Sequence, residues 1–459
     1  MSKSCNSIDL KPTRPYRCAV ASEDYSTSFY EGPPFKRVIK ELEGGNNFAN
    51  CVRFSPDGKY FAVGNSNKNV YLFDGKTADL VGVIGEEPTH QGGVYSLCFS
   101  PDSQELLTVS ADKTAKIWNV DSRQLETNFV MGTSVEDQQL GCLWQDDHII
   151  TVSLSGELKY LDRTNPDTPL KVIRGHNKAI VWVATDRKEA IFSGSFEGRI
   201  LKWNASTGEA IQFKGRGHNT KVTCALYDAN SNCLITAGLD DNVRFTDCDT
   251  CEYNNETAVP LESQPSAMAM ASDGGIVVAC QNELVLIKDG RKVCSLPWKA
   301  HFPAKIAVFG STIISTGVTT NSFKLYNIEN NTITATTDKF STNKAIYAFA
   351  VSPDLSKVAV ADFSSILVYN LCDNSFKDPE KSFHGHSSNI SALGWSPDGQ
   401  HLCSVSMDQQ LIVWDYASES KKTKRAYFKS VITDCTWLDD NTVVTVADDC
   451  AVKQWSISF

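Results

Sequence analysis

Histidines at one recurring position are the first residues of this sequence that could serve acid–base or metal chemistry. Four of the eight histidines precede short apolar segments: His90, His176, His218 and His386. None lies in an HxxxH motif or at the His/Cys spacing of a zinc site. Because all four precede an apolar segment in the same way, we instead predict that their side chains stabilise the fold through hydrogen bonds.

Hydroxyl, acidic and tryptophan residues follow these histidines at constant offsets. A strand Ser or Thr, a turn Asp and a strand Trp together with a His can form a hydrogen-bonded chain that links a loop to a sheet. Two complete sets and two partial ones fit this spacing: His90, Thr108, Asp112, Trp118; His386, Ser404, Asp408, Trp414; Thr445, Asp449, Trp455; and His176, Ser193, Trp203, with Glu197 in the place of Asp. Recurrence at one offset predicts a repeated structural unit.

Other candidate chemistry is weak. Asp74-Gly-Lys-Thr77 resembles the end of a phosphate-binding loop, but Val70 stands where the first glycine is required. Cys248 and Cys251 form the one tight cysteine pair, which we expect in a surface turn, because a zinc ribbon needs a second pair. No Gly-x-Ser-x-Gly motif or convincing nucleophile–base pair is present. We therefore predict no catalytic centre, metal or cofactor, and no enzyme.

Composition limits the partners and the compartment. The 459 residues include 44 Lys and Arg against 54 Asp and Glu, so the net charge of −10 argues against nucleic acid or an anionic membrane as main partner. No apolar run approaches the ~20 residues of a membrane helix, and the N-terminal residues carry no signal-peptide pattern. The fifteen scattered cysteines are typical of reduced thiols. These features predict a cytoplasmic protein.

Short strands must position the recurring side chains. A Ser-Pro-Asp turn joins two apolar strands at four places, which begin at Ser55, Ser100, Ser352 and Ser396. Pro and Asp favour tight turns, so each segment predicts a hairpin. A third strand then ends in an aromatic residue, such as Trp118, Trp203, Trp414 or Trp455. Units of this kind recur every 40–45 residues, which is the WD-repeat signature.

Counting the units predicts the domains. Eleven units begin near residues 7, 47, 92, 138, 176, 218, 263, 302, 343, 386 and 430. Because propellers close with about 4–8 blades, eleven units predict two rings. We expect an all-β WD40 propeller fold, with a complete seven-bladed ring at residues 169–459 and about four blades of a second ring at residues 1–168. Pro169–Arg174 is expected to supply the missing outer strand of the eleventh unit.

Aromatic and charged side chains gather in the first quarter of the chain. A Gly-Pro-Pro turn precedes Phe35, and such a rigid turn can hold the ring outward. Aromatic and Arg side chains dominate protein–protein anchors, so this segment is a candidate binding patch, with packing between blades as the alternative for each ring. The basic run Lys421–Arg425 is expected to be a solvated loop between blades.

Several longer motifs resemble the actin-interacting protein 1 family. They are Thr13-Arg-Pro-Tyr-Arg17, Phe29-Tyr-Glu-Gly-Pro-Pro-Phe-Lys36, Asn50-Cys-Val-Arg-Phe-Ser-Pro-Asp-Gly58, Asp112-Lys-Thr-Ala-Lys-Ile-Trp118 and Glu136-Asp-Gln-Gln-Leu-Gly-Cys-Leu-Trp144. The resemblance runs from about residue 6 to Phe459. It implies two seven-bladed propellers, so that about three blades would precede Met1, and binding without catalysis to actin filaments decorated with ADF/cofilin, whose disassembly the family promotes.

The resemblance also implies a binding surface on the first propeller. The positions that correspond to it here are Glu23, Asp24, Phe35, Lys36, Arg37 and Phe48. Glu23 stands where the family commonly has Asp and keeps the charge, whereas Arg37 stands where a Phe is usual. The alternative function is a generic WD40 scaffold that uses one face of the complete ring. An enzyme on a propeller fold is disfavoured, since no catalytic cluster is apparent.

Overall fold

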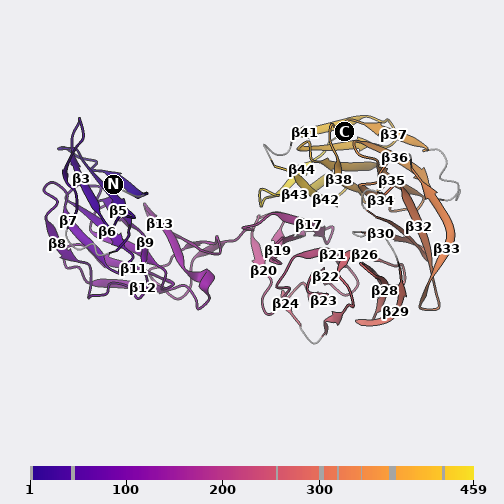
Figure 1. Ribbon diagram of the computed structural model, residues 1–459, viewed down its shortest axis with the longest axis horizontal. Helices are drawn as coiled ribbons and strands as arrows, with labels where there is room; N and C mark the ends of the chain where they lie inside the picture. The colour runs from indigo at the N-terminus through magenta and orange to yellow at the C-terminus, as the bar shows by residue number, and fades with distance from the viewer. Residues whose placement is uncertain are drawn as a thin grey trace. The chain divides into compact units, whose positions relative to one another are not determined.

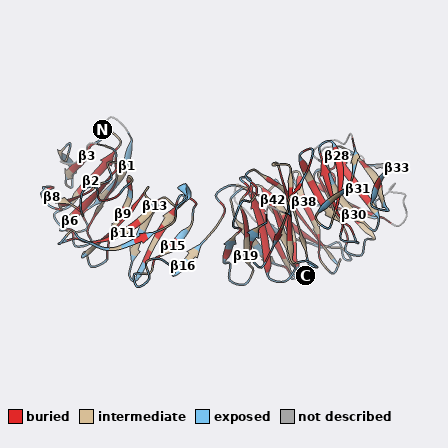
Figure 2. Ribbon diagram, turned by 90° about the horizontal axis from the view of Figure 1, so that it is seen from below, coloured by how far each residue is buried: buried red, intermediate tan, exposed pale blue. Residues whose placement is uncertain are grey.

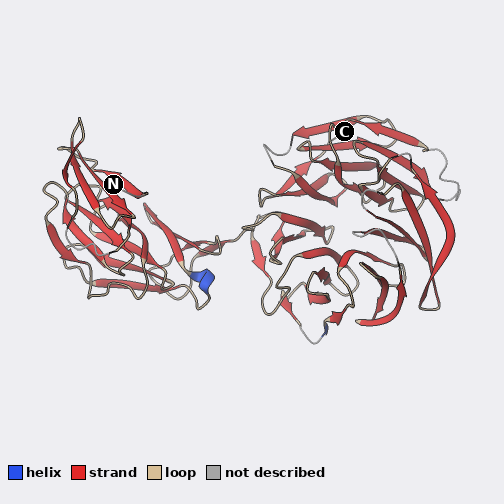
Figure 3. Ribbon diagram, viewed as in Figure 1, coloured by secondary structure: helices blue, strands red, loops and turns tan. Residues whose placement is uncertain are grey.

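The chain consists of consecutive antiparallel β-sheets. The computed structural model describes residues 4–42, 47–254, 257–298, 304–317, 320–342, 344–371, 379–425 and 430–458. Figure 3 shows that strands make up nearly all of the regular structure, and η1 (Val135–Asp137) is a short 3-10 helix. Contacts divide the chain into two compact units, Met1–Arg174 and Gly175–Phe459. No helix among the described residues is both long and apolar enough to cross a membrane.

The first unit contains four sheets of four strands, and the strands of each sheet pair in chain order. The sheets are β1 (Cys5–Leu10), β2 (Arg17–Ser22), β3 (Thr27–Glu31), β4 (Lys36–Ile39); β5 (Ala49–Phe54), β6 (Tyr60–Asn65), β7 (Val70–Asp74), β8 (Leu80–Val83); β9 (Val94–Phe99), β10 (Glu105–Ser110), β11 (Thr114–Asn119), β12 (Leu125–Val130); and β13 (Gln139–Gln145), β14 (His148–Ser153), β15 (Leu158–Tyr160), β16 (Lys171–Ile173).

Among the described residues, the second unit contains seven sheets, whose strands run from β17 to β44 in Figure 1. They are β17 (Ile180–Thr185), β18 (Ala190–Ser195), β19 (Ile200–Asn204), β20 (Ala210–Gln212); β21 (Val222–Asp228), β22 (Cys233–Gly238), β23 (Asn242–Asp247), β24 (Glu252–Tyr253), β25 (Val259–Pro260); β26 (Pro265–Met270), β27 (Ile276–Cys280), β28 (Glu283–Lys288), β29 (Arg291–Pro297); β30 (Ala304–Phe309), β31 (Thr312–Gly317), β32 (Ser322–Glu329), β33 (Thr332–Ser341); β34 (Ala348–Val351), β35 (Lys357–Ala361), β36 (Ser365–Asn370), β37 (Lys381–His384); β38 (Ile390–Trp395), β39 (His401–Ser406), β40 (Gln410–Asp415), β41 (Lys421–Arg425); and β42 (Ile432–Asp439), β43 (Thr442–Ala447), β44 (Val452–Ser456).

The count of eleven repeat units is therefore confirmed, as is the all-β propeller fold. In every sheet the first strand in the chain is the inner strand, and the next two strands follow it outward. We call the edge where the inner strand begins and the second strand ends the upper edge, and the opposite edge the lower edge. Loops at the upper edge carry the recurring His and Asp residues.

The Ser-Pro-Asp turns at the lower edge form as the sequence predicts. The Ser55 hydroxyl donates to the Asp57 carboxylate at 2.6 Å and also accepts the Tyr60 backbone N–H at 3.0 Å. The same serine-to-aspartate bond recurs in the three other copies, from Ser100, Ser352 and Ser396. Each bond fixes the hairpin between an inner strand and the second strand, so one sequence motif sets the register of four sheets.

The cores lie between neighbouring sheets, as the buried stripes in Figure 2 show. Between the first and second sheets, Phe61 stacks on Phe29 and on Phe73 with ring centroids 5.6 and 5.0 Å apart. Among the aromatic residues in the first quarter of the chain, Phe29 is therefore part of the core. Sheet-on-sheet burial of this kind supplies most of the stabilisation of a propeller, at ~25 cal/mol per Å² of apolar surface.

The seven sheets of the second unit form a closed cycle. Each inner strand contacts the next, and the first inner strand β17 contacts the last one, β42. At this closure the Thr433 hydroxyl donates to the Ile180 carbonyl at 2.6 Å, and the Asp434 carboxylate accepts the Val183 N–H at 3.0 Å. Val444 joins the buried cluster that packs the closing sheets together.

The prediction that Pro169–Arg174 supplies the outer strand of the eleventh unit is wrong. Lys171–Ile173 pairs with β15 of the fourth sheet, in register with Leu158–Tyr160, and the seventh sheet of the ring has three strands among the described residues. The unit boundary accordingly follows Arg174. The physical reason is proximity in the chain: a connection of about ten residues costs little loop-closure entropy when the strand pairs with β15. The ring closes through packing of β17 against β42 instead.

Candidate functional site

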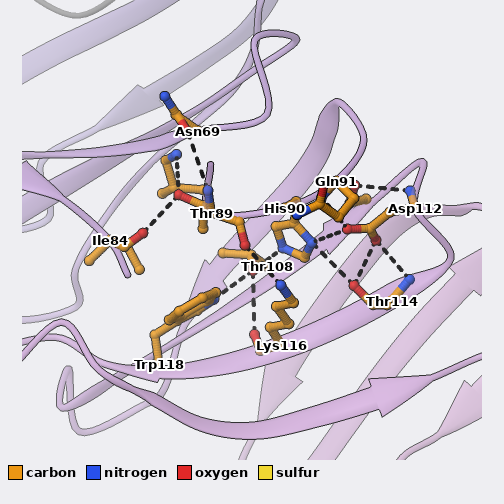
Figure 4. Close-up of polar contacts among 12 residues, drawn as sticks. Asn69, Ile84, Thr89, His90, Gln91, Thr108, Asp112, Thr114, Lys116 and Trp118 are labelled. Carbon is orange, nitrogen blue, oxygen red and sulfur yellow. Dashed lines mark hydrogen bonds and ion pairs between the residues drawn. The ribbon is translucent and has the colours of Figure 1, made fainter. Parts of the chain in front are cut away.

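The predicted His–Thr–Asp–Trp set of the third sheet is a continuous hydrogen-bonded chain (Figure 4). His90 donates through Nδ1 to the Asp112 carboxylate at 2.9 Å and accepts the Thr108 hydroxyl at Nε2 at 2.8 Å. Trp118 then donates its indole N–H to the same hydroxyl at 2.9 Å. The chain ties the loop before the inner strand to the second and third strands.

Burial keeps this chain in one protonation state. Burial lowers the pKa of His90, which is fully enclosed, so its imidazole is neutral. Burial alone would raise the pKa of Asp112, but hydrogen bonds from His90 and Thr114 outweigh it and hold that pKa well below its usual value. A neutral donor against a fixed carboxylate is a structural joint, with no group poised to exchange protons near pH 7.

The other sets differ in completeness. His386 is hydrogen-bonded to Asp408 at 2.9 Å and to Ser404 at 2.8 Å, and the Trp414 indole N–H donates to Ser404. His218 is hydrogen-bonded to Asp240 at 2.7 Å and to Thr236 at 2.9 Å, and Thr246 stands in the place of Trp. The Thr445 hydroxyl accepts the Trp455 indole N–H at 2.8 Å, and the Ser193 hydroxyl is bonded to His176 and Trp203 at 2.7 Å each. Asp449 of the last sheet instead contacts Lys453 at 3.2 Å.

The His176 set lacks its acceptor. Glu197 stands four residues after Ser193, where the other sets have Asp, and its side chain is exposed. His176 Nδ1 is consequently buried without a hydrogen-bond partner in the described part of the chain. An unpaired buried donor costs about 1–3 kcal/mol.

Shortening this side chain should therefore stabilise the ring. We expect Glu197→Asp to raise the free energy of unfolding by about 1 kcal/mol, because the carboxylate can then accept the His176 N–H. Urea unfolding at pH 7 measures the change. Glu329→Asp, which changes an exposed glutamate of the same ring, is the matched control and should change nothing. An unchanged or lower value for E197D would mean that the loop cannot bring the shorter carboxylate onto the imidazole.

The candidate binding residues fall into two places. Glu23 and Asp24 lie in the loop after β2, and Phe48 precedes β5, so all three are at the upper edge. Phe35 and Lys36 lie at the start of β4, at the lower edge. β3 separates the two groups by roughly 15 Å, at ~3.3 Å per residue.

The lower-edge group is a small exposed surface. Phe35 is 47% exposed beside the turn that the Gly-Pro-Pro segment makes, and Arg37 follows on β4, paired with Tyr30. Lys36 lies opposite Glu31 in the ladder. The predicted patch is thus not continuous, because β3 runs across the sheet from the upper edge to the lower edge between the two groups.

Two residues of the upper-edge group, Glu23 and Phe48, line a cleft of about 370 Å³. Its lining residues come from all four sheets of the first unit: Asn6, Glu23, Phe48, Asn50, Tyr95 and Leu140. Phe48 also lies against Tyr25, with ring centroids 5.0 Å apart. The cleft thus combines apolar walls with two amides and one carboxylate. Such a concave site with few polar groups suits protein or ligand recognition.

Asp24 has a structural role in this loop. Its carboxylate accepts the Ser26 backbone N–H at 3.2 Å and the Ser26 hydroxyl at 2.5 Å. Asp112 makes the same contacts with Thr114 in the third sheet. Asp24 therefore occupies the position of the recurring turn aspartate and holds the loop that presents Glu23.

The Glu23 carboxylate is the group free for a partner. The backbone N–H of Glu23 donates to the Ser4 carbonyl at 3.0 Å, which fixes the residue in place. Among the residues that the structure describes, no cation or hydrogen-bond donor contacts the Glu23 carboxylate. An unpaired carboxylate beside apolar walls can bind a cationic side chain of another molecule.

Sequence reasoning missed Tyr95 and Leu140. Both lie at the second residue of an inner strand, where apolar residues alternate in any case, and only the convergence of four inner strands places them in one cleft. Their shared place as the second residue of an inner strand was the available signal. Cys248 and Cys251 lie in the turn after β23 as expected, but their side chains are buried in a core cluster and are not on the surface. Among the described residues, no group of His, Cys, Asp and Glu is arranged to hold a metal.

Comparisons with known proteins agree with the repeats. The model of the WD domain, G-beta repeat, matches residues 36–74, 83–119, 211–247 and 377–415. A crystal structure of the WD40 beta propeller domain of Doa1 has a TM-score of 0.52 at 15% identity and covers 62% of this chain and 95% of its own, which shows the fold.

Relatives match along the whole chain. WD repeat-containing protein 1 of Xenopus tropicalis and that of Gallus gallus are each 38% identical over 100% of this chain and 76% of their own length. Actin-interacting protein 1 of Drosophila melanogaster is 36% identical over 99% of this chain and 75% of its own. Similarity of this extent cannot arise from the WD motif alone, because it also covers the sheets that the repeat model does not match. The chain belongs to the family of WD repeat-containing protein 1 and actin-interacting protein 1.

Proposed function

We propose that this protein binds actin filaments decorated with ADF/cofilin and promotes their disassembly without covalent chemistry. The observation that carries the proposal is the upper-edge cleft, where Glu23 and Phe48 converge in a chain related along its length to actin-interacting protein 1. This function assigns the chain to the cytoskeleton in the cytoplasm. A scaffold for another complex is the alternative.

A protein that disassembles filaments by binding alone must bind one state of the filament, here the decorated one, more tightly than the other. A ligand shifts an equilibrium only by the difference between its affinities for the two states. A tenfold preference for decorated filaments corresponds to about 1.4 kcal/mol, which one well-placed contact can supply. The structural requirement is therefore a site that recognises a surface present only in the decorated filament.

Co-sedimentation tests the proposal. The protein should pellet with cofilin-decorated filaments at least several-fold more than with bare filaments, and it should shorten decorated filaments in a time course. A tube without filaments controls for aggregation. Equal pelleting with both filaments would contradict the dependence on cofilin, and no pelleting with either would favour the scaffold.

Two surface variants test which edge of the first sheet contacts the filament. Glu23→Ala should weaken pelleting because it removes the unpaired carboxylate of the cleft. Phe35→Ala tests whether the lower edge, with Lys36 and Arg37, also contacts the filament. Interface anchors typically cost ~1–4 kcal/mol on truncation. Normal binding by F35A would restrict the contact to the upper edge, whereas normal binding by E23A would remove Glu23 from the site.

A further inference from the structure

Every sheet of the first unit has two faces. We call the face toward the next sheet in the chain the forward face and the opposite one the backward face. At the first junction, Phe29 on the forward face of the first sheet packs in one cluster with Phe61 and Phe73 on the backward face of the second sheet. Three such junctions join the four sheets. The backward face of the first sheet and the forward face of the fourth sheet lie outside them.

The forward face of the fourth sheet carries the side chains of a junction. Directly paired residues of neighbouring strands lie on one face of a sheet, and the pairing places six residues on this face: Leu143, Ile150, Val152, Leu158, Tyr160 and Ile173. Their counterparts in the pairing of the third sheet all pack against the fourth sheet: Cys98, Leu107, Val109, Ala115, Ile117 and Phe129. The fourth sheet therefore repeats a forward face that has another sheet to cover.

The backward face of the first sheet repeats the other half of a junction. The pairing places six residues on it: Ile8, Leu10, Cys18, Val20, Ser28 and Tyr30. Their counterparts in the second sheet all pack against the first sheet: Val52, Phe54, Phe61, Val63, Tyr71 and Phe73. The chain thus has one open face of each kind. Within one copy the two faces stay uncovered, since Ile8 is 63% and Leu143 is 51% exposed.

Turns at the lower edge make a second contact across a junction. The Asp57 backbone N–H in the turn of the second sheet donates to the Ser103 hydroxyl in the turn of the third sheet at 3.1 Å. In the ring, the Asp398 N–H donates in the same way to the Asp440 carboxylate of the following sheet at 2.9 Å. A side chain in the turn after an inner strand therefore reaches back to the turn of the preceding sheet.

The corresponding turns of the two end sheets carry opposite charges. Arg14 is the fourth residue after the inner strand of the first sheet, as Ser103 is in the third sheet, and it is exposed. The turn between β13 and β14 of the fourth sheet consists of the exposed Asp146 and Asp147. Among the residues that the structure describes, neither carboxylate has a hydrogen-bond or ion-pair partner. A first sheet placed on a fourth sheet would bring Arg14 to these two carboxylates.

We infer that two copies of this chain associate through their first units, with the backward face of each first sheet on the forward face of the partner's fourth sheet. A contact between two different faces either closes into a ring or continues as an open polymer. Two rows of four sheets make eight sheets, and propellers close with about 4–8 blades. The dimer is therefore a closed ring of eight sheets. This inference does not depend on filament binding.

Sedimentation velocity of the full chain tests the association. Between about 1 and about 50 µM the protein should pass from monomer to dimer and no further. Leu158→Glu, on the forward face of the fourth sheet, should raise the dissociation constant of the dimer at least tenfold, because it places a charge in both junctions. Leu80→Glu is the matched control. Leu80 has the same 38% exposure but lies on the outer strand of the second sheet, so L80E should dimerise like the parent.

Three results of this experiment would overturn the inference. They are a parent that stays monomeric at about 50 µM, a parent that forms a series of larger polymers, and an L158E variant that dimerises as tightly as the parent. Circular dichroism of L158E confirms that the variant is folded, and the charge exchange below tests the same contact without changing an apolar residue.

Exchanging the charges tests which sheets meet. Arg14→Glu and Asp147→Arg should each weaken the dimer severalfold at about 50 mM salt, because each places like charges opposite one another. The two changes together restore an opposite pair, so R14E/D147R should dimerise more tightly than either single variant. A combined variant that is no tighter than the weaker single one would show that the first and fourth sheets do not meet.

Trypsin gives a readout that unspecific association would not give. In dilute protein the row is single and its end sheets are open, whereas in the dimer every sheet has a neighbour on both sides. Residues 1–174 should therefore be cut several times more slowly at about 50 µM than at about 1 µM, relative to the second unit. The second unit closes within one chain and is the internal reference. A ratio that does not change with concentration would contradict closure of the first unit by a second copy.

Discussion

Limited proteolysis of the chain is expected to leave Gly175–Phe459 intact long after Met1–Arg174 has been degraded. In the second unit every sheet has a neighbour on both sides, because β17 contacts β42. In the first unit the inner strands contact one another in a row from β1 to β13. Repeated sheets depend on their neighbours for stability, so the sheets at the ends of a row unfold most readily.

Exposed apolar side chains mark these two end sheets. In the first sheet Ile8 is 63% exposed, and Leu10 is exposed as well; in the fourth sheet Leu143 and Leu158 are exposed. Such surface invites association, and its exposure forfeits ~25 cal/mol per Å² that burial would supply.

Mass spectrometry of a tryptic time course decides the matter. The first cuts should fall within Met1–Arg174 or directly after it, and the expressed fragment 175–459 should be monomeric and unfold in one cooperative transition. A fragment 1–174 that resists trypsin as long as 175–459 would show that its end sheets are stable without further neighbours.

Sequence reasoning found the inner strands, the hairpin turns and the third strands because each has a local chemical cause. The Ser55 hydroxyl and the Asp57 carboxylate lie only two positions apart in the chain and form their bond within one turn. Trp118 likewise needs a fixed offset to reach Thr108. Repetition of these short-range causes made the count of eleven sheets predictable.

Outer strands escaped prediction because little of the sequence constrains them. Lys421–Arg425 was expected to be a loop, but it is β41, paired with β40. An outer strand has one partner and is largely exposed, so its residues show no apolar alternation, and lysine is common at such edges. For the same reason nothing local decided between the two sheets that Lys171–Ile173 could join.

The candidate site was predictable only in part. Glu23 and Phe48 come together because one loop follows β2 and the other precedes β5, and both loops lie at the upper edge. Phe35 is near Glu23 in sequence but at the other end of a strand. Tyr95 and Leu140 lie at β-bulges, where the pairing with the second strand skips them. A bulge leaves no mark in composition, since it is a property of pairing between strands.

Acid should weaken the ring through its buried histidines, of which His176 is the first. Burial lowers the pKa of His176 to about 3, whereas an unfolded histidine takes up its proton near pH 6.5. Between these values the unfolded state binds more protons than the folded state, so stability falls as pH falls. For the fragment 175–459, His176 should cost about 2–3 kcal/mol of the free energy of unfolding between pH 7 and pH 4.5. His386, whose pKa is also lowered by burial, acts in the same direction.

Urea unfolding of this fragment at several pH values measures the loss, and Glu197→Asp identifies its source. An aspartate that accepts the His176 N–H favours the charged imidazole and so raises the pKa of His176 toward its usual value. The E197D ring should therefore be more stable at pH 7 and also lose less of that stability on acidification. His384→Gln, which changes an exposed histidine outside the His–Asp sets, should leave the acid-dependent loss intact. A free energy of unfolding that stays level from pH 7 to pH 4.5 would mean that His176 accepts a proton inside the folded ring, and the missing aspartate would then carry no energetic penalty.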